Sequence, residues 1–210
     1  DLAVVDIASA TATDVFALAR KDHSVSGNGI DPSDKDGTKI RTLPQGVYGL
    51  PMPDTIATYT AGGSTYLVSA NEGDAREWGT YKEDLRVKDL GKNGVPPLCA
   101  DSPVLAGTDW ASVKADTNLG RLKITRASGL SADGSCYQEL YAFGARSFSI
   151  WTTAGELVFD SGDDVEQITA ATPGVAFNAN HEDNVADGRS DDKGPEPEAV
   201  TIGDVVLMVG

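Results

Sequence analysis

Short apolar runs, separated by turns rich in glycine and proline, dominate the hydrophobic pattern of this chain. The strand-length runs are LAVVDI, STYLVSA, RLKIT, LYAFGA, SFSIW, ELVFD, AVTI and VVLMV. No window has the sustained 3.6-residue period and the end signals of a long helix. The best helix candidate, ATDVFALARK, fits the alternation of a strand equally well. With 23 glycines and 10 prolines in the chain, the pattern predicts an all-β fold.

Two hairpin patterns each occur twice along the chain. MPDTIATYTAGGSTYLVSANE and EPEAVTIGDVVLMVG share the order proline, acid, apolar strand, glycine turn and second apolar strand. SFSIWTTAGELVFD and, more loosely, LAVVDIASATATDVFAL read as strand, turn and strand. Propeller blades provide inner and outer strand pairs of these two kinds. We therefore predict that residues 1–210 are part of a single β-propeller domain, with a β-sandwich as the rival architecture.

The phase of this repeat predicts that the chain begins and ends within a blade. It opens on an outer-type hairpin and closes on the apolar stretch VVLMVG, which alone would expose an unpaired sheet edge. We expect the remaining blades of a larger parent protein to be its partners. Long acidic loops span 21–41, 71–118 and 178–198, and loops of this length are usually functional or disordered.

Acids outnumber bases by 32 to 17 among the 210 residues, so the formal net charge is −15. This balance excludes nucleic-acid binding as the expected function, because phosphate contacts need a basic surface. The surplus fits calcium binding, a saline-adapted surface or simple solubility. No apolar run is long enough to span a bilayer, and a signal peptide is absent or already removed.

The two cysteines, Cys99 and Cys136, both lie in polar, loop-like surroundings. Unpaired structural cysteines are usually buried, so we predict one disulfide between them in preference to two free thiols. A disulfide implies an oxidising compartment and hence a secreted or cell-surface location, extracellular or periplasmic.

The stretch DPSDKDG is one candidate cation site. It places Asp31, Asp34 and Asp36 directly before Gly37. Closely spaced oxygen ligands next to a glycine suit a hard cation such as calcium. An acidic turn without any bound ion is the alternative.

A second candidate site lies where the run STYLVSA ends. Asn71, Glu72 and Asp74 follow this inner-type strand, and Glu196 and Glu198 precede the corresponding strand of the second copy. Acids at matching positions of several blades converge near a propeller axis, where they bind a cation or are balanced by arginine. Arg76 is the nearby candidate for balancing this cluster, and a set of solvated acids is the alternative.

Arg146 stands between two predicted strands and should balance loop carboxylates. We expect its partner among Asp191, Asp192, Glu196 and Glu198, with Lys193 as a second source of positive charge. The stretch FDSGDDVEQ reads as a hairpin turn.

Motifs for nucleophilic catalysis are missing from the sequence. His23 and His181 are the two histidines, and there is no G-x-S-x-G elbow, no H-E-x-x-H zinc motif and no P-loop. His181 is explained at least as simply as a solvated loop residue as it is by a role as a general acid or a metal ligand.

Specific strings spread over almost the whole chain resemble the choice-of-anchor I family. They are KDHSVSGNGIDPSDKDG, MPDTIATY, YLVSANEGDAR, NLGRLKIT, ELYAFGARSFSIW, ELVFDSGDDVEQIT and RSDDKGPEPEAV. The resemblance implies a β-propeller on a secreted or cell-surface protein, and animal members imply a link to calcium mineral. Some members carry the label alkaline phosphatase or phytase-like, but the family supplies no catalytic residues to transfer.

Two classes of function therefore remain open. The first is a calcium-binding module of the cell surface with a role in binding, adhesion or mineral deposition. The second is a calcium-dependent phosphoesterase in which Glu72, Asp74, Glu196 and Glu198 would be metal ligands or bases. The expected ligands are small ions or a phosphate-bearing molecule.

Overall fold

The computed structural model describes residues 1–180 and 182–203, most of which lie in strands, turns and loops. The strands are β1 (Leu2–Asp6), β2 (Thr11–Phe16), β3 (Lys21–Asp22), β4 (Val47–Leu50), β5 (Thr55–Ala61), β6 (Ser64–Asn71), β7 (Glu77–Trp78), β8 (Tyr81–Lys82), β9 (Asp84–Arg86), β10 (Lys123–Thr125), β11 (Leu140–Phe143), β12 (Ser147–Thr152) and β13 (Leu157–Asp160). The chain also has two short α-helices, α1 (Trp110–Val113) and α2 (Asp164–Ala171). Two 3₁₀ turns lie at Val87–Asp89 and Pro103–Leu105. The all-β class is thus confirmed. None of the helices in the described ranges has the length and apolar character needed to cross a membrane.

A four-stranded antiparallel sheet carries the predicted hairpins. Its order is β13–β12–β6–β5, and residues 72–146 are inserted between the central strands β6 and β12. The predicted hairpins β5–β6, β12–β13 and β1–β2 are all present. The β5–β6 connection has two residues, Gly62 and Gly63, with φ of +58° and +81°. Glycine reaches this left-handed region at little steric cost, which is why the pair makes a tight hairpin turn.

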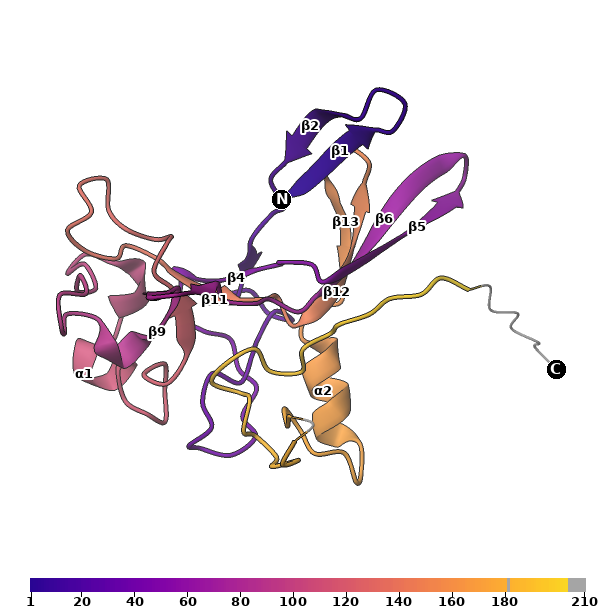
Figure 1. Cartoon of the computed structure of the whole chain (residues 1–210). Coiled ribbons are helices and arrows are strands. Elements are labelled where there is room, and N and C mark those ends of the chain that lie inside the picture. The colour runs from indigo at the N-terminus through magenta and orange to yellow at the C-terminus, as the bar shows by residue number, and fades with distance from the viewer. Residues whose placement is uncertain (181, 204–210) are drawn as a thin grey trace.

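The second sheet organises the hydrophobic core. It has five strands in the order β3–β4–β11–β10–β9, with β4 and β11 parallel. Figure 1 shows this sheet with its long loops on one side of the molecule and the four-stranded sheet on the other, next to hairpin β1–β2. The core is built from fully buried residues such as Val47, Val104, Leu122, Ile124 and Leu140. The loops of the insertion pack onto this core, so they hold fixed positions.

The predicted propeller is not confirmed by the described residues. Their strands form separate sheets of five, four, two and two strands, which do not close into a barrel or propeller. Residues 199–203 have no regular secondary structure, so the predicted strand AVTI is absent. The predicted strand VVLMV lies outside the described residues. The candidate ATDVFALARK contains most of strand β2 and no helix.

The stretch FDSGDDVEQ contains the predicted turn only in its first half. It turns at Gly162–Asp163 and then continues as helix α2, which the sequence did not predict. Asp164 and Glu166 lie in the first turn of this helix, where the helix dipole favours negative charge. Glu166 is also fully buried, so the helix lacks the amphipathic pattern by which a sequence would reveal it.

Candidate functional site

Residues 187–196, which we call the closing segment, contact the nearby residues 177–178 and the distant strand β10. The amides of Asp187 and Arg189 donate to the carbonyls of Phe177 and Asn178 at 2.6 and 2.7 Å. The amide of Lys123 in β10 donates to the Asp191 carbonyl at 2.9 Å. The closing segment therefore hydrogen-bonds to the first residue of β10 in the five-stranded sheet, and it brings its charged side chains to the acids of the other loops.

Arg146 is the buried anchor of this arrangement. Its guanidinium donates to the Ser190 carbonyl at 2.7 Å and to the Asp31 carbonyl at 2.8 Å. Its ionic partner is Glu166 of α2, at 2.7 Å, and both side chains are almost fully buried. The prediction of an Asp191, Asp192, Glu196 or Glu198 carboxylate as its partner was therefore wrong. Arg146 reaches the closing segment through backbone carbonyls, and the helix supplies the carboxylate.

Three of the predicted site residues lie around the ammonium group of Lys193. Its Nζ lies 2.5 Å from Glu72 Oε1, 2.9 Å from Glu196 Oε1 and 3.7 Å from Asp74 Oδ1. Burial lowers the pKa of Lys193, but hydrogen bonds to Glu72 and Glu196 outweigh it and raise the pKa above its usual range. The lysine is therefore charged and neutralises this group of acids. Glu198, in contrast, is exposed and has no ion pair among the residues described.

The other acids of the closing segment are bound by cations of the five-stranded sheet and its loops and by Arg189 of the segment itself. Asp191 pairs with Arg86 and with Arg121, the latter at 2.9 Å. Asp192 pairs with Lys123 at 2.9 Å and with Arg189 at 3.1 Å. Beside these pairs is a polar cavity of about 220 Å³, lined by residues that include Asp74, Glu77, Asp84, Lys123, Arg189 and Lys193.

Asn71 and Arg76 have partners outside this cluster. Asn71 is fully buried, and its amide donates to Ser149 Oγ at 2.7 Å across the four-stranded sheet. Arg76 forms a two-point pair with Glu83, at 2.8 and 3.1 Å. Hydrogen bonding to Arg76 lowers the pKa of Glu83 to about 2. Lys193 thus supplies the positive charge that Arg76 was expected to supply to this cluster of acids.

Asp31 is held by backbone donors in the loop that follows Ile30. It is fully buried, and its carboxylate accepts the amides of Ser33 and Lys39 at 3.2 and 2.5 Å. Burial raises the pKa of Asp31 to about 6. The side chain therefore shapes the loop that carries the next two acids.

Asp34 and Asp36 are paired with arginines. Arg121 donates to both oxygens of Asp34, at 2.6 and 2.9 Å. Arg41 donates to Asp36 Oδ2 at 3.2 Å. Within residues 1–180 and 182–203, no three or more histidine, cysteine or acidic side chains form a group that could hold a metal ion. Calcium binding by the predicted ligands stays a prediction.

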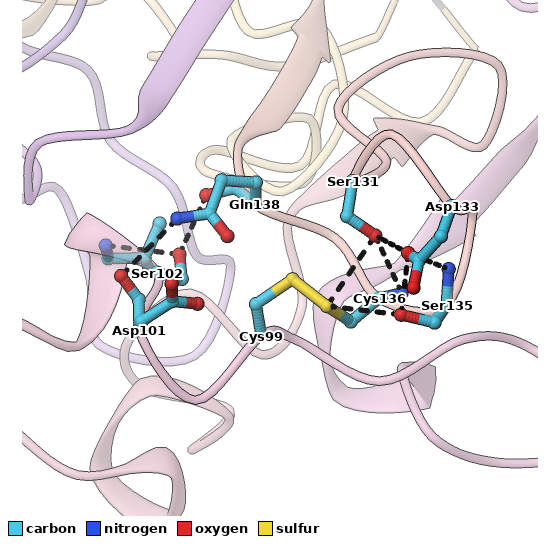
Figure 2. Close-up of a disulfide and its surroundings, with 9 residues drawn as sticks. Cys99, Asp101, Ser102, Ser131, Asp133, Ser135, Cys136 and Gln138 are labelled. Carbon is cyan, nitrogen blue, oxygen red and sulfur yellow. Dashed lines mark hydrogen bonds between the residues drawn. A yellow bond between two sulfur atoms is a disulfide. The ribbon is translucent and has the colours of Figure 1, made fainter.

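The predicted disulfide between Cys99 and Cys136 is confirmed. It joins two loops of the insertion that are 37 residues apart in sequence. Figure 2 shows Ser131, Asp133 and Ser135 beside the bridge, where Ser135 donates to the Asp133 carboxylate at 2.8 Å. Asp133 thus lies in a tight turn that Ser131 and Ser135 stabilise.

The histidines do not form a catalytic arrangement in the part of the chain that is described. His23 is buried, and its Nδ1 lies 2.8 Å from the Asn28 carbonyl, which can only accept a hydrogen bond. Burial lowers the pKa of His23 to about 4, so it is neutral at pH 7. His181 lies outside the described residues.

Sequence reasoning missed two buried ionic partners. Glu166 was assigned to a turn, and Lys21 was overlooked although its Nζ lies 2.6 Å from Asp160. Neither pairing leaves a signal in the sequence, because Lys21 and Asp160 are far apart along the chain, and Arg146 and Glu166, although only 20 residues apart, lie in different segments that the fold brings together. The unusual density of charge in the closing segment was the one usable signal, and it led to Lys193.

Comparison with known proteins gives related chains but no solved structure. The chain is 29% identical over 201 residues to the mesenchyme-specific cell surface glycoprotein of Strongylocentrotus purpuratus, covering 84% of this chain and 26% of that protein. It is 33% identical over 109 residues to gigasin-3a of Magallana gigas, covering 47% of this chain and 38% of that protein. No solved structure matches the chain significantly.

The chain therefore spans only about a quarter to two fifths of these relatives. The sequence profile of the Choice-of-anchor I domain matches residues 1–207. This match covers nearly the whole chain and agrees with the resemblance of its motifs. The chain belongs to the choice-of-anchor I family.

Proposed function

We propose that this chain is a binding module of an extracellular or cell-surface protein and that it has no catalytic activity of its own. A relative named as a cell surface glycoprotein supports the location, and the Cys99–Cys136 disulfide is suited to an oxidising compartment.

The proposal rests on one observation, which is that the predicted acids are already paired with basic side chains. Glu72 and Glu196 share the Lys193 ammonium at 2.5 and 2.9 Å, and Asp34 is bound at two points by Arg121. A general base or metal ligand needs a carboxylate that is free to accept a proton or a cation. Carboxylates already paired with lysine and arginine serve to join loops, which is what a stable binding surface requires.

A calcium-dependent phosphoesterase is the alternative. Metal ions there would polarise a phosphoryl oxygen and activate a water molecule. The cavity beside Lys193 contains both acids and bases, but Lys123, Arg189 and Lys193 are all engaged with Asp192 or Glu196. A substrate phosphate would have to displace these pairs, and this favours the non-catalytic module.

We also propose that the four-stranded sheet is one blade of a larger propeller. Its strands carry exposed apolar side chains, among them Ile56, Phe148 and Phe159. Such side chains would be covered by neighbouring blades, and the matched relatives are much longer than this chain. A structure of the full-length gene product tests this proposal, and sheets stacked face to face as a sandwich would contradict it.

The location is tested by labelling intact cells with an antibody against this chain. We expect the same signal before and after permeabilisation, and loss of the signal when protease is added to intact cells. A signal that needs permeabilisation and survives external protease would contradict the proposal.

A further inference from the structure

Lys21 and Asp160 form a buried ion pair between the two large sheets. Lys21 belongs to β3, at one edge of the five-stranded sheet, and Asp160 is the last residue of β13, at one edge of the four-stranded sheet. The Lys21 Nζ lies 2.6 Å from Asp160 Oδ1, and the two side chains are only 6% and 16% exposed. The fold therefore holds an amine and a carboxyl group in contact at a place with little access for water.

Two backbone carbonyls fix the position of the Lys21 amine. Its Nζ donates to the carbonyls of Ala145 and Gly162, both at 2.8 Å. Burial lowers the pKa of Lys21, and the opposing attraction of Asp160 does not cancel this effect. The environment therefore favours the neutral amine, which carries a free electron pair and is the nucleophilic form of lysine.

The Asp160 carboxyl group is oriented by three hydrogen-bond donors. Its Oδ2 accepts from Ser147 Oγ at 2.9 Å and from Ser149 Oγ at 2.5 Å, and both serines are fully buried. Its Oδ1, which is the oxygen next to Lys21, accepts from the amide of Gly162 at 2.8 Å. Fixed donors of this kind stabilise negative charge that develops on a carboxyl oxygen when a nucleophile adds to the carbon.

The ion pair of Lys193 provides a contrast within the same chain. Its Nζ lies 2.5 Å from Glu72 Oε1, but Glu196 shares the ammonium at 2.9 Å. Hydrogen bonds to these two acids raise the pKa of Lys193, so this lysine stays charged and is not a nucleophile. Within the described part of the chain, Lys21 has Asp160 as its single ionic partner. Proximity is thus common to both pairs, whereas an environment that favours the neutral amine belongs to Lys21 alone.

We propose that Lys21 and Asp160 become joined by an intramolecular amide bond between their side chains, with loss of one water molecule. A proton first passes from Nζ to Oδ1, which gives an amine and a carboxylic acid. The nitrogen then bonds to the carboxyl carbon, and a second proton moves from nitrogen to Oδ1. The bond between the carbon and Oδ1 breaks, and Oδ1 leaves with both protons as water. Oδ2 remains as the amide oxygen, and the nitrogen keeps one proton.

A cavity beside the pair can receive the released water. Its volume is about 240 Å³, and its lining includes Lys21, Ser149, Trp151 and Asp160. A water molecule occupies about 30 Å³ in the liquid, so the product has room to leave the carboxyl carbon. Exclusion of bulk water from the pair also favours condensation over the reverse hydrolysis. The bond ties β3 to β13 and thereby joins the two large sheets covalently. It is a single reaction within the chain, and it is independent of the function proposed above.

Mass spectrometry of the purified chain tests this bond directly. We expect the intact mass to be lower, by one water molecule, than the mass of the sequence with its disulfide. After reduction and tryptic digestion, fragmentation should identify a branched peptide that joins the segment of Lys21 to the segment of Asp160. The internal control is the pair of Lys193 and Glu72, whose two peptides should be recovered separately.

Lys21→Arg is the matched variant, because it keeps the positive charge and lacks the amine that forms the bond. It should have the full mass, with no water lost. On a reducing, denaturing gel the wild type should migrate faster than Lys21→Arg, since the amide keeps a large loop closed in the unfolded chain. Circular dichroism shows whether the variant is folded, and the peptide map of the wild type tests the bond even if it is not.

Two results would overturn the inference. One is an intact mass equal to that of the disulfide-bonded sequence, with linear peptides from both segments, which is expected if Lys21 and Asp160 remain an ion pair. The other is a loss of water without the branched peptide, as produced by a succinimide at an Asp-Gly sequence such as Asp36–Gly37. Surface labelling of intact cells is independent of both results.

Discussion

The Lys193 ammonium lies 2.5 Å from Glu72 Oε1 and so joins the end of strand β6 to a residue 121 positions further along the chain. Glu196 accepts from the same ammonium at 2.9 Å. The contact with Glu72 attaches the closing segment to the end of β6, and the contact with Glu196 lies within the segment.

We predict that Lys193→Met destabilises the protein by about 3 kcal/mol, because removing one partner leaves carboxylates that are partly buried and uncompensated. Chemical denaturation measures the loss. The double variant with Glu72→Gln should lose less than the sum of the two single variants. Additive losses would mean that the pair contributes no coupling energy.

Gly194 is where the closing segment passes over Arg146. A Cβ atom at this position would lie 2.8 Å from both Cδ and Nη1 of Arg146, and φ is +64°. We expect Gly194→Ala to cost about 3 kcal/mol through steric overlap and left-handed backbone strain together. Gly107 is the matched control, since its φ is +74° and a Cβ there would meet nothing within 4 Å. Gly107→Ala should cost about 1 kcal/mol. Equal losses in unfolding experiments would contradict the close approach to Arg146.

The pKa of His23 predicts how stability depends on pH. Burial lowers this pKa from 6.5 to about 4, so between these values the unfolded chain binds a proton that the folded chain does not. Stability should therefore fall as the pH drops from 6.5 towards 4, by roughly 3 kcal/mol in total. Replacement by glutamine should remove this part of the pH dependence.

The contribution of Asp31 to stability changes with pH in the opposite direction, over an overlapping pH range. Its pKa is raised to about 6, so its contribution is greatest below pH 4 and declines as the pH rises through 6. The pH profile of unfolding must therefore be compared between the wild type and His23→Gln. If the two profiles run parallel from pH 4 to 6.5, His23 is not a buried neutral side chain.

The disulfide should stabilise the insertion. It closes a loop of 37 residues, for which the chain-entropy estimate is about 4 kcal/mol. We expect the double variant Cys99→Ser, Cys136→Ser to unfold at lower denaturant concentration by an amount of that order. Adding a reductant to the wild type should give the same shift, and a reductant that has no effect would contradict an intact bridge.

Local patterns in the sequence were sufficient for the hairpins. The alternation of SFSIWT and the Gly62–Gly63 turn depend on neighbouring residues alone, and both structures were predicted. The disulfide was also predicted, because two cysteines allow one pairing. Helix α2 was not, since its stability depends on Glu166 meeting Arg146 in the interior.

Predictions about the site were limited by long-range charge pairing. Glu72, Asp74 and Glu196 were expected to lie close together, and they do. The sequence could not show that the Lys193 ammonium would lie between these acids. It also could not show that the Asn71 side chain would be buried against the four-stranded sheet. Opposite charges of this kind meet only after the core has brought the loops together, so their pairing is a property of the fold.

Phosphate release from a chromogenic ester, with added calcium and then with a chelator, tests the central claim most directly. We predict that the purified chain shows no calcium-dependent turnover and that Glu72→Gln is indistinguishable from the wild type in this assay. Turnover that the chelator abolishes and that Glu72→Gln lacks would show that these acids are catalytic, and it would contradict the assignment of this chain as a non-catalytic binding module.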